Sequence, residues 1–87
     1  MKILDIGDIE KKDTPLHYRN EYTANLRYEG MGKSEVMKKI SFTIERDPLG
    51  KANIHINFHG ILEYPLIPAK KKITEYILDL DRQGKLV

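Results

Sequence analysis

The stretch ISFTIERDPLGKANIHINF, residues 40–58, decides the fold of this chain. Apolar and polar residues alternate on both sides of a central turn, so each arm is expected to be a strand with one buried face. In the turn, Asp47-Pro48-Leu49-Gly50-Lys51, proline occupies the second position of a type I turn and glycine suits the left-handed residue that follows. This pattern is typical of a three-residue hairpin loop with a bulge, and it places Asp47 opposite Lys51.

The turn also predicts the register of the hairpin. The apolar faces meet as Ile44 with Ile54, Phe42 with Ile56, and Ile40 with Phe58. The polar faces meet as Glu45 with Asn53, Thr43 with His55, Ser41 with Asn57, and Lys39 with His59. A shift of one residue would turn polar side chains toward the core, so the alternation favours this pairing alone.

The alternation continues toward the N-terminus. Even positions from Tyr18 to Tyr28 are apolar except Asn20, and the odd positions are polar, which predicts a further half-buried strand. A turn over 30–33 leads into the first strand of the hairpin, where Lys38 interrupts the apolar face and can snorkel if it lies near a sheet edge. The first residues have no clear period, and we expect a short strand there.

The C-terminal third changes to a helical period. Pro68 suits the first turn of a helix, Gly84 suits its end, and the stripe between them consists of Ala69, Ile73, Tyr76, Ile77 and Leu80. We therefore predict an α+β fold: an antiparallel four-stranded meander with one C-terminal helix on its apolar face (β-β-β-β-α). The expected strands cover about 2–10, 17–29, 35–46 and 51–60, and the helix covers about 68–83. A length of 87 residues allows one domain, residues 1–87.

The composition excludes several classes of protein. The chain is 40% hydrophobic with a net charge of +2, which is too apolar for a disordered chain. It has no cysteine, so disulfides, thiolate metal sites and cysteine nucleophiles are excluded. No apolar run reaches the length of about 18 residues that spans a membrane, and the N-terminus lacks a secretory apolar region. We expect a cytoplasmic protein with no membrane contact and no cofactor.

Chemistry-bearing residues gather on the polar face of the hairpin: Thr43, His55, Asn57 and His59, with His17 as a further candidate. Residues four apart on a strand are separated by about 13 Å, so the two hairpin histidines cannot share a metal ion. Thr43 opposite His55 is the nearest approach to a hydroxyl–imidazole pair, and no strained turn presents it. We expect solvent-exposed polar residues, no metal site and no enzyme, and an uncharacterised enzyme is the third alternative.

Lys70, Lys71 and Lys72 at the predicted helix start are the main candidates for binding. The N-terminus of a helix is the positive end of its dipole, so lysines there can attract phosphate or carboxylate groups. A solvated lysine run is the simpler interpretation. Lys38, Lys39 and Lys51 could add to the site. The aromatic residues fall on the apolar faces, which disfavours base stacking on the sheet.

Two functions from different classes follow. The first is a small non-catalytic binding module that contacts nucleic-acid phosphates or another polyanion, and the alternative is a protein-interaction module with an unknown partner. Four strands span about 19 Å and a helix only about 10 Å, so one helix cannot cover the apolar face. Residues 62–67 or a second subunit must cover the rest, which makes a homodimer a further expectation.

Overall fold

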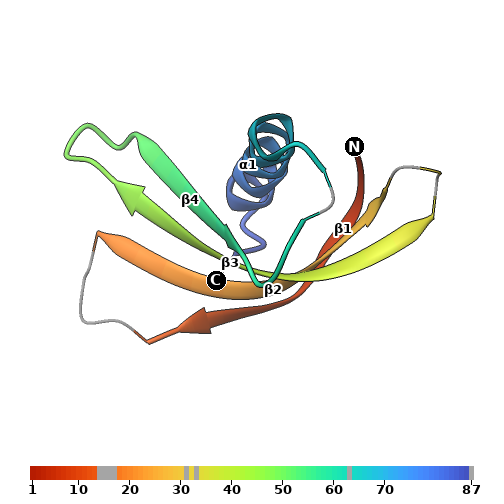
Figure 1. Ribbon diagram of the computed structural model, residues 1–87. Coiled ribbons are helices and arrows are strands. Elements are labelled where there is room, and N and C mark those ends of the chain that lie inside the picture. Colours follow the sequence, from red (N-terminus) through yellow and green to blue (C-terminus); the bar gives the residue numbers. More distant parts are fainter. Residues whose placement is uncertain (14–17, 31, 33, 63, 87) are drawn as a thin grey trace.

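The computed structural model describes residues 1–13, 18–30, 32, 34–62 and 64–86. Four strands precede one helix: β1 (Lys2–Lys12), β2 (Arg19–Glu29), β3 (Glu35–Arg46), β4 (Ala52–Phe58) and α1 (Leu66–Arg82). The strands form one antiparallel sheet in the order β1-β2-β3-β4. The sheet is curved, and α1 lies over its concave face (Figure 1). The predicted α+β meander with a C-terminal helix on its apolar face is confirmed.

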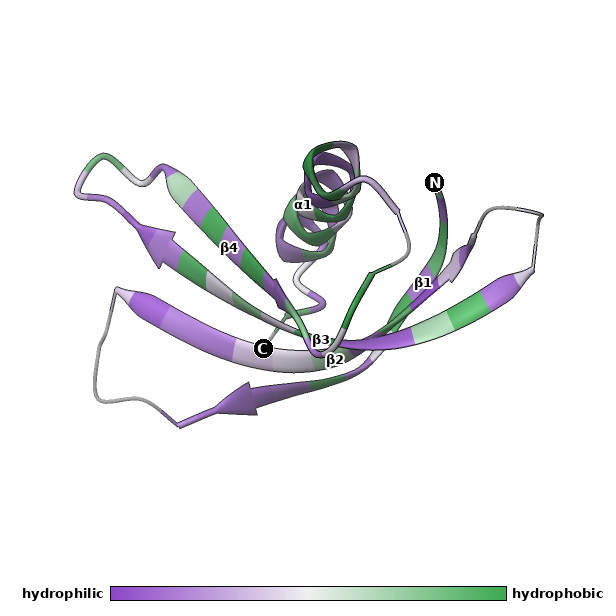
Figure 2. Ribbon diagram, viewed as in Figure 1, coloured by the Kyte–Doolittle hydropathy of each residue, from purple (hydrophilic) through white to green (hydrophobic). Residues whose placement is uncertain are grey.

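The core lies between the concave face and α1. Its buried side chains alternate along the two central strands, as Tyr22, Ala24, Leu26 and Tyr28 on β2 and Ile40, Phe42 and Ile44 on β3. From the helix, Ala69, Ile73 and Ile77 are completely buried. Figure 2 shows hydrophobic residues along these strands and on the helix above them. The Tyr22 and Phe42 rings stack with their centroids 4.9 Å apart, which adds a directed contact to the burial.

The β3–β4 hairpin has the predicted register. Ile44 pairs with Ile54, and every other predicted pair from residue 40 to residue 45 is present. Gly50 has φ +84° and its N–H donates to the Asp47 carbonyl at 2.9 Å. The Asp47 carboxylate also accepts from the N–H groups of Leu49 and Lys51, which fastens the loop. The side chain of Asp47 thus completes a turn that proline and glycine already favour.

The helix begins two residues before the expected start. Pro65 precedes it without a side-chain cap, and Pro68 lies in its first turn, where a missing N–H costs no helical hydrogen bond. At the other end Gly84 has φ +70°. The N–H of Gly84 donates to the Asp81 carbonyl and that of Lys85 to the Leu80 carbonyl, a Schellman motif. The role expected of Gly84 is therefore confirmed.

The two edges of the sheet are covered only in part. Half-buried side chains pack around the core from β1, from β4 and from the segments flanking α1, including Leu62 and Leu86. The expectation for Tyr18 was wrong, because it shares the apolar phase of β2 but is 58% exposed beyond the start of that strand. The expected polar position of His17 lies outside the described residues.

Candidate functional site

Arginines and lysines have different surroundings in this structure. All four arginines form ion pairs: Arg19 with Glu21 and Glu45, Arg27 with Glu35, Arg46 with Asp81, and Arg82 with Asp79. Among the described residues, by contrast, no lysine side chain has an ion pair or a hydrogen bond. The positive charge free to meet a ligand is therefore lysine charge.

Lys70, Lys71 and Lys72 are exposed in the second turn of α1, because the helix begins at Leu66 rather than at Pro68. No acidic residue lies in the first turn to offset them. Successive residues turn by about 100°, so the buried Ile73 places Lys71 on the side away from the sheet. Lys70 points to the β4 side and Lys72 to the β1 side, and the three ammonium groups therefore surround the helix instead of forming one patch.

A groove runs between the end of β4 and the start of α1. We call it the β4–α1 groove, and it is lined by Ile56, Asn57, Phe58, Gly60, Ile61, Leu62, Leu66 and Lys70. Phe58 is half-buried, so part of its ring faces this groove. Lys38 reaches the same place, since a Cβ added at Gly60 would stand 3.2 Å from the Lys38 ammonium nitrogen. The structure thus brings Lys38 and Lys70 to one apolar groove that contains an aromatic ring.

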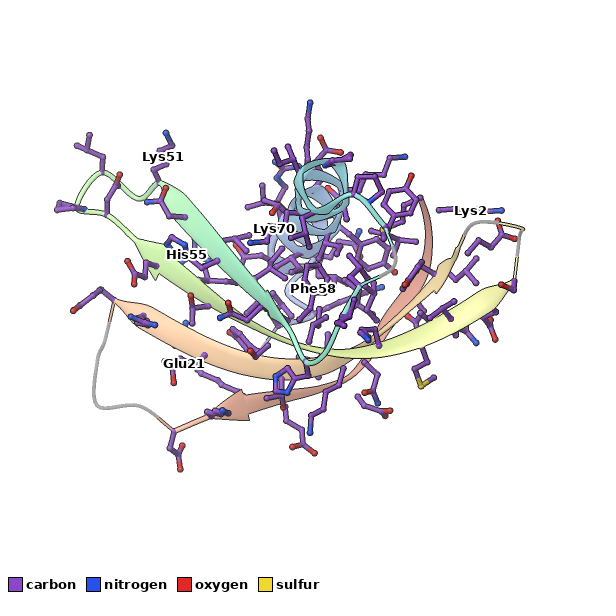
Figure 3. The ribbon with its side chains drawn as sticks, in the orientation of Figure 1. Lys2, Glu21, Lys51, His55, Phe58 and Lys70 are labelled. Carbon is purple, nitrogen blue, oxygen red and sulfur yellow. The ribbon has the colours of Figure 1, made fainter. Side chains whose placement is uncertain are left out.

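The other two candidate lysines do not join this groove. Lys39 follows Lys38 on β3, so it points to the opposite, convex face of the sheet, where it is exposed. Lys51 lies in the β3–β4 turn, at the other end of β4 from Phe58 (Figure 3). The six predicted lysines therefore occupy three regions of the surface.

The polar hairpin residues lie on the convex face, as predicted. Thr43 is opposite His55, and His55, Asn57 and His59 are exposed. The Thr43 hydroxyl is buried without a hydrogen-bond partner, so it does not contact the imidazole. In the part of the chain that the structure describes, no group of three or more histidine or acidic side chains could hold a metal ion. No helix among those residues is long and apolar enough to cross a membrane.

An ion pair that the sequence pattern did not reveal joins β3 to the end of α1. The Arg46 guanidinium donates to both carboxylate oxygens of Asp81, at 2.7 and 2.8 Å. Burial raises the pKa of Tyr22, the Asp81 charge raises it further, and Arg46 opposes the shift. This cluster fixes the helix on the sheet at the end opposite the β4–α1 groove, and we assign it a structural role.

Comparison with known families now adds an identity to this geometry. One family model matches residues 1–82, which is nearly the whole chain. The chain belongs to that family, the BB_0187 family. Neither curated proteins nor solved structures gave a match to this family member. The match extends from β1 through the end of α1, so every element of the fold described above lies within the family's shared region.

Sequence reasoning missed the apolar part of the site. Ile61 and Ile67 are each 85% exposed, and Leu66 is 52% exposed, around the connection between β4 and α1. These residues follow neither the strand period nor the helical stripe, and that irregularity was the available signal. Lys2 was also missed: it lines a depression together with Lys72, which only the packing of β1 against α1 brings near.

Proposed function

We propose that this family member is a small, non-catalytic, cytoplasmic module that binds single-stranded nucleic acid at the β4–α1 groove. The supporting observation is the meeting of Phe58 with the unpaired Lys38 and Lys70 in one groove. An exposed aromatic ring can stack with a base, and ammonium groups beside it can neutralise the flanking phosphates. A single strand suits this site because its bases are free to leave the stack.

The charge distribution supports weak, salt-dependent binding. Lys71 and Lys72 extend the positive surface from the groove across the exposed side of α1, along a path that a phosphate backbone could follow. A net charge of +2 gives little long-range attraction, so these local lysines must supply most of it. Each phosphate contact to a single strand contributes about 0.7 to the salt slope of the binding constant, and four such lysines would give about 3.

The test is an NMR titration of the labelled protein with short single-stranded DNA and RNA at two salt concentrations. We expect chemical-shift changes at residues 58–62 and 66–72 that shrink at the higher salt concentration. The convex face, reported by His55 and Asn57, should show no comparable changes and serves as an internal control. Shifts confined to the convex face, or no shifts at low salt, would contradict the proposal.

Protein binding is the second candidate function, favoured by the exposure of Ile61, Leu66 and Ile67. Exposed apolar side chains beside a groove are typical of surfaces that bind another protein. In this case the same titration gives no response to oligonucleotides, and association with a protein partner tolerates salt because apolar burial, not phosphate contact, drives it.

A further inference from the structure

The two edges of the sheet differ in how they are protected against pairing with another chain. Exposed edge strands usually carry charges, bulges or proline, which block edge-to-edge association. β1 has this protection: it contains six charged residues, two register irregularities, and Asp8 at φ +49°. β4 contains no charged residue and no proline, and its pairing with β3 is regular throughout. Only β4 is therefore a flat, neutral edge.

The backbone of β4 has a defined set of groups facing outward. The His59 N–H donates to the Lys39 carbonyl and the Asp47 N–H to the Lys51 carbonyl, both at 3.0 Å. Because the register between these two pairs is unbroken, the odd-numbered residues of β4 direct their backbone groups toward β3. The even-numbered residues, Ala52, Ile54, Ile56 and Phe58, direct their N–H and C=O groups to the open edge.

The sequence of this edge is self-complementary. Residues 53–57 read Asn-Ile-His-Ile-Asn in both directions, centred on His55. Two copies related by a two-fold axis at His55 would pair Ile54 with the other copy's Ile56 and Ala52 with its Phe58. These are all outward-facing residues, so this register is the one in which their backbone groups can bond. Apolar side chains meet on the concave face, and asparagine meets asparagine on the convex face.

We propose that β4 is a homodimer interface, at which two copies of this chain pair antiparallel about His55 and join two four-stranded sheets into one. The pairing satisfies the open backbone groups of the four even-numbered residues in each copy. It brings no like charges together, since neither strand carries a charged residue other than the titratable His55. The partner is a second copy because the matching sequence, including small Ala52 opposite large Phe58, is on the same strand.

The dimer also accounts for exposed apolar side chains beyond the strand. The two-fold axis brings the β3–β4 turn of one copy to the end of the joint where the other copy's β4 finishes. Leu49, 95% exposed at the tip of that turn, then approaches Ile61 of the other copy, which is 85% exposed. Contact between them would remove from water two side chains that a single chain leaves uncovered.

Single-cysteine variants test this register directly, because the chain has no cysteine of its own. Opposed residues at a site without mutual hydrogen bonds lie about 4.5 Å apart between Cα atoms, within the range that a disulfide spans. In the proposed dimer His55 faces His55, whereas the two Asn53 residues are separated by about 13 Å. Under mild oxidation we expect His55→Cys to form a covalent dimer and Asn53→Cys, equally exposed on the same strand, to form little.

The wild-type chain provides the second readout, without any nucleic acid present. Light scattering at high-micromolar concentration should give twice the 10.1 kDa mass of one chain. A monomeric mass would overturn the proposal, and so would disulfide formation by Asn53→Cys as fast as by His55→Cys. Neither measurement depends on the β4–α1 groove, so a failure of this proposal is distinguishable from a failure of the proposed nucleic-acid binding.

Discussion

Tyr22 lies in the core with 3% of its surface exposed, and its ring stacks on Phe42. Burial holds the pKa of its phenol above the ordinary value of 10.0, and Asp81 adds to that shift against the opposing effect of Arg46. The folded state therefore keeps its proton at a pH where the unfolded chain has lost it. A raised pKa in the folded state gives stability that is complete below the unfolded pKa and is lost as pH rises past it.

The prediction at this residue concerns alkaline pH. Between about pH 8 and about pH 11 the wild type should lose more stability than Tyr22→Phe, which has no phenol to ionise. Urea unfolding midpoints of both proteins at the two pH values measure the difference, and the lysines that also titrate there cancel in the comparison. Equal losses in the two proteins would show that Tyr22 does not carry this pH dependence.

Burial at single positions followed the sequence pattern only where a second strand lies on each side. Tyr22 and Phe42 are central and buried as expected, whereas Phe58 is half-buried on the edge strand β4 and Tyr18 is exposed beyond the start of β2. Alternation along a strand tells which face a side chain takes, but the exposure of that face depends on the neighbouring elements. The exposed part of Phe58 could not be predicted for this reason, although it supports the proposed function.

At the scale of elements, the two ends of α1 differ in how well local sequence defines them. Gly84 ends the helix in a left-handed conformation with nothing within 4 Å of an added Cβ, so backbone strain alone opposes a side chain there. Gly84→Ala should therefore lower the free energy of unfolding by about 1 kcal/mol. Urea denaturation measures this loss, and Gln83→Ala is the matched control because Gln83 has ordinary helical angles. Equal stability of the two variants would contradict the assigned role of Gly84.

The same contrast explains which elements could be predicted. Proline, glycine and alternation are local signals, and they predicted the β3–β4 register residue by residue. The start of α1 lacks a side-chain cap, so no local signal marked Leu66 as its first residue. The bulges of β1 were equally hidden, apart from the bend suggested at Gly7, because they arise from its pairing with β2.

At the scale of the whole molecule, the candidate site depends on long-range packing. Lys38 and Lys70 are far apart in sequence, and they meet because the connection after β4 turns back over the concave face. The lysine run could be recognised from the sequence, but its neighbours could not. The helix alone does not cover the sheet, as expected from its width, and the exposed edge of β4 is the part of that shortfall on which the homodimer proposal rests.

The most direct test of nucleic-acid binding is the salt dependence of oligonucleotide affinity, measured by fluorescence anisotropy. The wild type is compared with the triple variant K70A/K71A/K72A and with the charge-matched control K11A/K12A/K85A, whose lysines are exposed on β1 and after α1. Three lost phosphate contacts should lower the slope of log affinity against log salt by about 2 in the first variant, and the control should keep the wild-type slope. An unchanged slope in K70A/K71A/K72A, or an equal loss in the control, would contradict the proposed function.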